Sequence, residues 1–381
     1  MRRIALAFII PLSLLASIAR AQPAENTDVS DVSEVDDTSS VTSKSATEQP
    51  AFDVLGEVFS EYSYSEVASQ KQNAFEMTRA EVGIQRFGKH TMGGEIRLET
   101  IRSAGPNSFS GIDEDSLLVR LKRAWGFALH RHGDFEAEAR LGLVPTPWIE
   151  AVEVDYGMRF LAPSVGERLL FYDTSDIGAN VRLAYADRVH LSYALLNGEG
   201  RNQREQNRGK TSQGVVTIKA LSTPVAGDPL TLRVHLGGQE GSQGAGAARN
   251  HRLSAAATFV HPRVALGVEV HQSLGFEEVS TRKSRAASLW LRAHYKHLGA
   301  TLRIDDHEAD LDREMTGSRF YLAGLFAMKR TSMMTLRLGL VARIERSEAN
   351  ATVLPGLAFA GSQNALLLVL GVNFGSEETS L

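Results

Sequence analysis

The feature that most constrains this sequence is a long series of segments in which apolar and polar residues alternate with a period of two. Within residues 73–87, Ala80, Val82 and Ile84 share one parity, whereas Arg79 and Glu81 occupy the other. A period of two predicts β-strands, because successive side chains of a strand point to opposite faces. The charged parity recurs so regularly that one face of the sheet must contact water. A transmembrane β-barrel with a polar lumen satisfies both faces.

Further segments with this alternation predict an all-β fold, a transmembrane antiparallel β-barrel of about sixteen strands. An apolar stretch at Thr352–Ala360 is assigned to the last external loop, because Pro355 cannot donate to a strand ladder and a further strand would leave the chain end on the wrong side. The predicted strands lie near residues 54–64, 74–87, 93–103, 116–130, 134–143, 177–186, 189–196, 213–221, 230–239, 252–260, 264–274, 286–296, 300–305, 319–328, 334–345 and 365–374.

The beginning of the chain has the pattern of an export signal. Arg2 and Arg3 precede an apolar run, which ends in the A-x-A pattern of residues 19–21. We therefore expect a signal peptide over 1–21 that is cleaved; the alternative, a membrane-anchoring helix, is disfavoured because the run is short and contains Pro11. No later stretch approaches roughly 18 uncharged apolar residues, so helical membrane spans are not predicted. The chain has no cysteine, hence no disulfide and no lipidated cysteine.

Residues 22–51 differ in composition from the remainder, residues 52–381, to which we assign the barrel domain. This segment is rich in Ser, Thr and acidic residues, and its only cation is Lys44. We predict a disordered periplasmic segment, because so little apolar area cannot offset the entropy of ordering. A contact with peptidoglycan or with a basic partner is the functional alternative. The carboxylates are Glu25, Asp28, Asp31, Glu34, Asp36, Asp37 and Glu48.

The connections between predicted strands alternate in length, as short periplasmic turns and long external loops do. The longest is 144–175, and a loop of this length without a strand of its own needs a function or a place to fold. We expect it to fold into the lumen as a third loop that narrows the pore, the alternative being an external cap. The predicted constriction residues are Pro145, Pro147, Trp148, Glu150, Arg159 and Arg168.

The polar parity predicts which charges face the lumen, because an arginine on the lipid face at mid-depth costs about 2–4 kcal/mol. Cations outnumber carboxylates on this parity, which favours weak anion selectivity; the alternative is that these charges pair across strands and only keep the lumen hydrated. The predicted cations are Arg79, Arg97, Arg120, Lys122, Arg140, Arg182, Lys219, Arg233, Arg252, Arg292, Lys296, Arg303, Arg337 and Arg343, and the carboxylates are Glu81, Glu95, Glu99, Glu136, Glu138, Glu269, Asp305 and Glu345.

Enzymatic and metal chemistry have little support in the sequence. No G-x-S-x-G motif is present, and the serines and histidines have no spacing typical of a triad. The acidic cluster at 305–312 lacks the glycine and terminal glutamate of a calcium loop, so a site for a divalent ion or for bridging lipopolysaccharide is only an alternative to a solvated loop. We predict no catalytic residue, no metal, no cofactor and no nucleic-acid partner.

Three motifs suggest a family. Residues 141–148 (LGLVPTPW), 173–179 (DTSDIGA) and 193–200 (YALLNGEG) resemble Gram-negative porins of the phosphate-selective porin O and P type. The resemblance covers roughly residues 56–214 through these motifs and the second half by strand pattern alone. It implies a sixteen-stranded, homotrimeric outer-membrane channel with an inward third loop. The phosphate-binding ladder of that family does not map onto this sequence residue by residue, and the acidic third loop departs from it.

The sequence therefore predicts a porin in the outer membrane of a Gram-negative bacterium, a channel for passive diffusion of ions and small hydrophilic solutes. The expected partners are outer-membrane lipid, lipopolysaccharide and the barrel-assembly machinery. The last strand resembles a signal for that machinery, although residues 375–381 follow Phe374. A structural, adhesive or receptor-like barrel and an outer-membrane enzyme are the alternatives.

Overall fold

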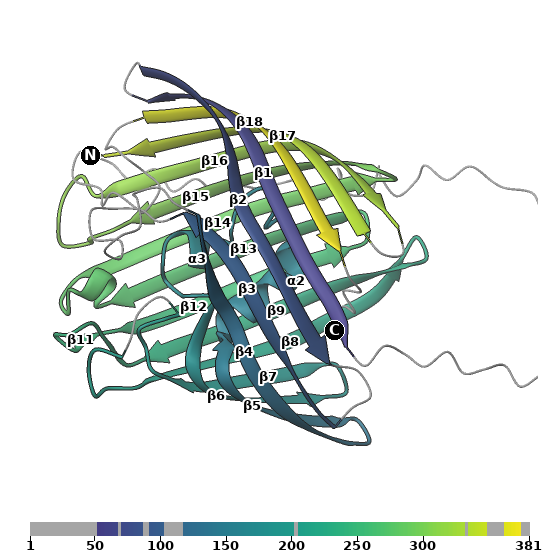
Figure 1. Cartoon of the computed structure of the whole chain (residues 1–381), viewed down its shortest axis with the longest axis vertical. Coiled ribbons are helices and arrows are strands. Elements are labelled where there is room, and N and C mark those ends of the chain that lie inside the picture. Colours follow the sequence, from purple (N-terminus) through teal and green to yellow (C-terminus); the bar gives the residue numbers. More distant parts are fainter. Residues whose placement is uncertain are drawn as a thin grey trace, which may run out of the picture.

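The protein is a closed antiparallel β-barrel of sixteen strands, in which each strand pairs with its neighbour in the sequence and β1 closes against β18 (Figure 1). The computed structural model describes residues 52–67, 70–86, 91–102, 117–201, 205–331, 334–348 and 362–374. The predicted peptide 1–21, the acidic segment 22–51 and the Thr352–Ala360 stretch lie outside these residues. The fold class predicted from the alternation is confirmed.

Most strands are longer than predicted, β7 and β13 coincide with their predicted ranges, and every strand overlaps its predicted range. The barrel contains β1 Asp53–Val67, β2 Gln70–Arg86, β3 Met92–Arg102, β4 Leu117–His132, β5 Phe135–Pro145, β6 Ser175–Tyr185, β7 Val189–Leu196, β8 Thr211–Val225, β9 Asp228–Glu240, β12 His251–His261, β13 Val264–Leu274, β14 Lys283–Tyr295, β15 Leu298–Glu308, β16 Gly317–Arg330, β17 Met334–Ser347 and β18 Ser362–Phe374.

The two ends of the barrel differ in their connections. At one end, named here the short-turn end, tight turns such as Ala186–Arg188 and Lys296–His297 join the strands. The start of β1 lies at this end, since Asp53 pairs with Gln85 shortly before β2 finishes. The opposite end, named the long-loop end, carries the two-stranded sheet of β10 (Ser242–Gln243) and β11 (Ala248–Arg249) and the short helix η1 (Phe276–Glu278).

The outer face of the barrel is apolar. Leu302, Leu325 and Leu338 are 57%, 65% and 48% exposed, whereas Arg303 and Val341, which lie on the opposite parity, are buried. This pattern is that of a barrel that places aliphatic side chains against lipid and polar ones inside. Among the described residues, no helix is both long and apolar enough to cross a membrane.

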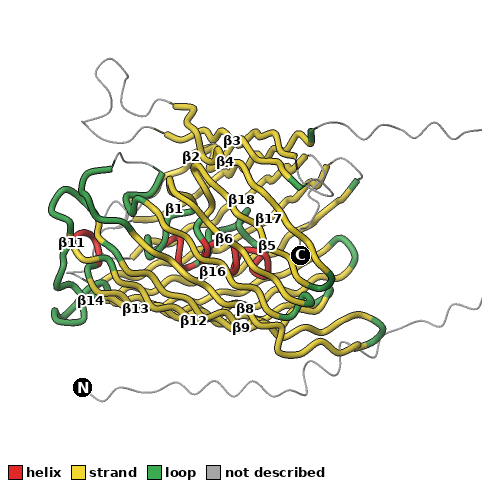
Figure 2. The backbone as a smooth tube through the Cα atoms, turned by 90° about the horizontal axis from the view of Figure 1, so that it is seen from below, coloured by secondary structure: helices red, strands yellow, loops and turns green. Residues whose placement is uncertain are grey.

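The connection between β5 and β6 contains two helices, α2 (Pro147–Tyr156) and α3 (Val165–Arg168), drawn in red in Figure 2. Pro147 begins α2, where its fixed φ suits the first turn and its missing N–H costs nothing. Gly157 ends α2 with a φ of 58°, a left-handed conformation that glycine adopts without strain. The connection is therefore residues 146–174, because Val144, Pro145 and Ser175, which we had placed in it, belong to the strands.

Candidate functional site

Residues 146–174, named here the β5–β6 segment, pack against the buried parity of the strands β8 to β18. Trp148 is fully buried in a cluster with Val215 of β8 and Ala256 of β12. A side chain at Gly237 would clash with Trp148, its Cβ lying 2.6 Å from the indole ring, so the bare backbone of β9 makes room for this residue. The β5–β6 segment thus has an apolar contact of its own with this wall.

The second half of the β5–β6 segment makes a similar contact further around the barrel. Phe160 and Leu161 pack with Phe326 of β16, Val341 of β17 and Val369 of β18. The two clusters cover much of one wall of the barrel. Such packing contributes about 1.5–3 kcal/mol for each fully buried large apolar side chain.

Buried polar contacts supplement this packing at α2. Trp148 Nε1 donates to Glu269 Oε1 at 3.0 Å, and Asp155 accepts from Thr258 at 2.5 Å. Asp155 also pairs with Arg233 and with His235. Burial alone would raise the pKa of Asp155, but these partners hold it below its ordinary value.

At α3, Arg168 reaches two strands at once. Its guanidinium lies 3.0 Å from an Asp305 oxygen and 3.3 Å from a Glu345 oxygen, and it stacks over the ring of Phe320 at 4.3 Å. Arg303 also pairs with Asp305 and donates to Tyr156 Oη at 2.5 Å. Two arginines therefore share the buried Asp305 carboxylate, which leaves it compensated.

The wall formed by β1 to β6, named here the charged wall, has a different character, because charged side chains of both signs lie on it and pair with one another. Arg97 lies 2.6 Å from Glu95, Arg120 lies 2.7 Å from Glu99, and Lys122 is bonded to Glu81. A β-bulge between β3 and β4 turns both Lys122 and Arg123 away from the outer face, with Lys122 buried and Arg123 half-buried. The bulge therefore adds a cation to this wall.

Only a few ion pairs join the β5–β6 segment to the charged wall. Glu150 of α2 accepts from Arg140 at 2.8 Å and lies 3.8 Å from Arg182, while Glu167 lies 3.8 Å from Arg79. Burial alone would raise the pKa of Glu150, but Arg140 and Arg182 lower it to about 2. Glu150 is therefore ionised at neutral pH.

Between the segment and the charged wall, several buried polar atoms make no hydrogen bond to any described residue. They include Arg123 Nε, Arg159 Nε and Glu167 Oε2. Buried polar groups are nearly always satisfied by protein or by water. The side chains of Arg120, Glu150 and Arg182 are also 27%, 28% and 33% exposed, which suits a hydrated gap here.

Twelve of the predicted lumenal residues, named in the following sentences, are all buried or half-buried on the parity opposite the exposed leucines, but they do not form one ring. Most lie on the charged wall, namely Arg79, Glu81, Arg97, Arg120, Lys122, Glu138, Arg140 and Arg182. Arg233 and Arg292 lie at the end of α2, where Arg292 donates to Tyr156 O at 3.3 Å. Arg337 stacks over Phe160, and Arg343 donates to Leu161 O.

Lys296 is a correction, because it lies in the exposed β14–β15 turn and not on the inner face. Alternation extended one residue past the end of β14 misplaced it. The sequence reasoning placed Glu269 on the inner face but did not identify Glu269 or His271 as anchors of the segment. Histidine on the polar parity of a strand was the available signal, for His271 bonds both Ser254 and Glu269 at 2.7 Å.

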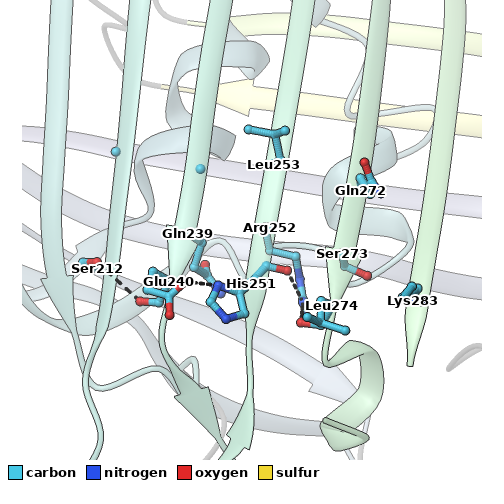
Figure 3. Close-up of a pocket in the computed structure, with 12 residues that line it drawn as sticks. Ser212, Gln239, Glu240, His251, Arg252, Leu253, Gln272, Ser273, Leu274 and Lys283 are labelled. Atoms are coloured by element: carbon cyan, nitrogen blue, oxygen red, sulfur yellow. Dashed lines mark hydrogen bonds and ion pairs between the residues drawn. The ribbon is translucent and has the colours of Figure 1, made fainter. Parts of the chain in front are cut away.

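A separate groove of about 620 Å³ lies at the long-loop ends of β8, β9, β12, β13 and β14 (Figure 3). Its lining residues bond one another, with Arg252 donating to His251 O at 2.8 Å and Ser212 to Glu240 O at 3.4 Å. Arg252 also donates to Phe171 O at 3.3 Å. The groove is thus connected to the end of the β5–β6 segment.

Comparison with solved structures defines the class of fold. The chain is similar to an anion-selective porin from Comamonas acidovorans (12% identity, TM-score 0.57, covering 85% of this chain and 99% of that one) and to Salmonella typhi OmpF (12%, 0.56, 84% and 97%). It is also similar to OmpT of Vibrio cholerae (13%, 0.54, 85% and 97%). No protein-family model and no curated protein matches the sequence.

These likenesses assign the chain to the sixteen-stranded fold of Gram-negative outer-membrane porins. Identities this low carry the fold and not a solute. None of these three structures is described as a phosphate-selective porin, so the narrower resemblance to porins O and P is not confirmed and stays a prediction.

Proposed function

We propose that the protein is an outer-membrane porin that forms a water-filled channel for passive diffusion of ions and small hydrophilic solutes. The observation that carries this proposal is the closed barrel whose outer face is apolar and whose inner wall is charged. A barrel of sixteen strands is wide enough to leave an aqueous channel. The proposed passage runs between the β5–β6 segment and the charged wall, where polar atoms lack protein partners.

In this proposal the β5–β6 segment is the constriction, the role expected of an inward third loop. The segment is anchored on β8 to β18, and the side that faces the charged wall carries Glu150, Glu153 and Arg159. Solutes would pass groups of both signs, Arg79, Arg97 and Arg120 on the wall and Glu150 and Glu167 on the segment. Such closely spaced charges bias ion flux through the local potential.

The finer parts of the proposal are a weak anion preference, a homotrimeric assembly, export with cleavage of 1–21, insertion by the barrel-assembly machinery and contact with lipopolysaccharide. The anion preference is supported by the excess of inner cations, and one similar structure is described as an anion-selective porin. It is opposed by the many ion pairs on the charged wall, so we propose a small preference and not phosphate specificity. No contact among the described residues favours a structural, adhesive, receptor-like or enzymatic barrel.

The test is reconstitution of the purified protein into a planar lipid bilayer. We expect discrete conductance steps and, in a salt gradient, a small reversal potential with the sign of anion preference. Correctly folded protein, shown by strand-dominated circular dichroism and heat-modifiable migration, that gives no steps would refute the channel. Steps with a cationic reversal potential would refute only the selectivity.

A further inference from the structure

The short-turn end of the barrel carries cations without ionic partners. None of them makes an ion pair with any other residue that the structure describes. All are exposed except Arg263, which is half-buried. Three of them, Arg188, Arg263 and Lys296, lie in turns. The other three end strands, namely Arg86 in β2 and Lys329 and Arg330 in β16.

The long-loop end shows that this is not a general property of the surface. There Lys283 pairs with Asp312 at 3.5 Å, Arg285 with Glu308 at 2.6 Å and Arg319 with Asp306 at 2.9 Å. These exposed cations at that end therefore have carboxylates beside them, although Arg208 and Arg249 make no ion pair with a described residue. Among the described residues at the short-turn end, Glu136 pairs with Arg131 and Asp187 with Lys219, and the remaining carboxylates, Asp53, Asp134 and Asp228, are fewer than the six cations.

The chain itself contains a segment of complementary charge, tethered to this end. Residues 22–51 include Asp28, Asp31, Asp36 and Asp37 among their acids and only Lys44 as a cation. The segment joins β1 at Asp53, which pairs with Gln85 beside Arg86. On the other side of β1 lies β18, then β17, then β16 with Lys329 and Arg330. Residues 22–51 thus join the barrel at a strand that has Arg86 on one side and Lys329 and Arg330 on the other.

Neither the length of residues 22–51 nor their effective concentration prevents this segment from contacting the cations of the short-turn end. Strands lie about 4.8 Å apart, so Arg330 is about 15 Å from β1 and the far side of the barrel roughly 30 Å away. An extended chain covers about 3.3 Å per residue, so 22–51 can reach any turn. A short tether also gives an effective concentration on the order of millimolar, enough for a weak ionic contact.

We propose that the acidic segment 22–51 binds in cis to the ring of unpaired cations at the short-turn end of its own barrel. The bound segment would neutralise this rim and place carboxylates at the mouth of the barrel. The contact is ionic and exposed, so it weakens as the Debye length falls from about 10 Å at 0.1 M salt to about 3 Å at 1 M. This inference does not depend on the channel proposal.

The absence of cysteine allows a direct measurement on the full chain in detergent. Nitroxide labels at Val35→Cys and His297→Cys report the distance from the segment to the β14–β15 turn by pulsed dipolar spectroscopy. We expect a short-distance peak at about 50 mM salt that is lost at about 1 M. A distribution that is broad at both salt concentrations would overturn the proposal.

Two matched variants locate the contact. Combining Arg86→Gln, Lys329→Gln and Arg330→Gln should remove most of the short-distance peak. Combining Arg208→Gln, Lys283→Gln and Arg313→Gln, which removes the same charge at the long-loop end, should retain it. Equal losses in both variants, or none in the first, would overturn specific docking on this rim.

A lipid surface is the competing use of these cations, and the same labels can identify it. In nanodiscs of zwitterionic lipid the short-distance peak should persist. Its loss in nanodiscs of anionic phospholipid, at the same low salt concentration, would assign the cations to lipid headgroups and overturn the proposal for the membrane-embedded protein. Channel conductance, measured separately, tests the proposed function independently of this result.

Discussion

The two halves of the inner wall have opposite relations to the β5–β6 segment. Strands β8 to β18 hold it with apolar clusters and buried polar contacts, including Trp148 with Glu269 and Arg168 with Asp305. Strands β1 to β6 face it mainly with charges that pair among themselves, such as Arg97 with Glu95. The first wall can fix the segment in place, and the second can remain hydrated. One inner face of uniform alternation thus provides both a wall that holds the segment and a charged wall that faces it.

The largest expected effect comes from removing the segment that separates the two walls. Deleting residues 150–167 should raise single-channel conductance at least about two-fold and admit larger solutes, because an unfilled barrel of this size encloses an aqueous channel. Single-channel recording and liposome swelling measure both. Deletion of 242–249, which forms the small β10–β11 sheet, is the control and should change conductance little. Unchanged conductance in correctly inserted 150–167 deletion protein would place the passage elsewhere.

A smaller effect should follow from loosening the supporting wall without shortening the chain. Trp148→Ala removes a fully buried indole and its bond to Glu269, a change that costs about 3–5 kcal/mol in a packed core. We expect a lower temperature of heat modification and noisier open-channel current. Val154→Ala, on the same helix but 54% exposed, is the matched control. Quiet current in Trp148→Ala would show that the packing does not hold the segment.

Neutralising cations of the charged wall should change the ion selectivity of the channel and not the stability of the barrel. Arg120→Gln combined with Arg182→Gln neutralises its more exposed cations, so the reversal potential in a salt gradient should shift towards cation preference. Arg313→Gln, which is exposed in a long loop, should leave the potential unchanged. Exchanging Lys122 or Arg140 is a poorer test, because both are buried and bonded to carboxylates. A shift of equal size in Arg313→Gln would show that surface charge alone sets the potential.

The strands and their polar faces could be predicted from the sequence, whereas the contacts between distant residues could not. Alternation is a local property, so it located every strand of the barrel and the polar parity of residues such as Arg97 and Arg303. It could not pair Trp148 with Glu269, which are far apart in the chain and meet only through the closure of the barrel. It also missed helix α2, because one short helix carries little periodic signal beside strands of such length.

The smallest effect concerns the few contacts that cross from the segment to the charged wall. In the folded protein, burial would raise the pKa of Glu150, but Arg140 and Arg182 lower it to about 2. In the unfolded chain, a glutamate titrates at about 4.3. Because its folded pKa is lowered, its stabilisation is complete above about pH 4.3 and is lost as the pH falls towards 2. A hydrogen bond to a charged group contributes about 1.5–3 kcal/mol.

Glu150→Gln should therefore lower the temperature of heat modification at pH 7, and the gap from the unaltered protein should close progressively between about pH 4.3 and 2. Melting in detergent across this range measures it, with Glu205→Gln in an exposed loop as the control. A gap that already closes between pH 7 and 5 would mean that Glu150 is not held by Arg140. Among the described residues, the ion pairs of Glu150 with Arg182 and of Glu167 with Arg79, each at 3.8 Å, would then remain between the segment and the charged wall.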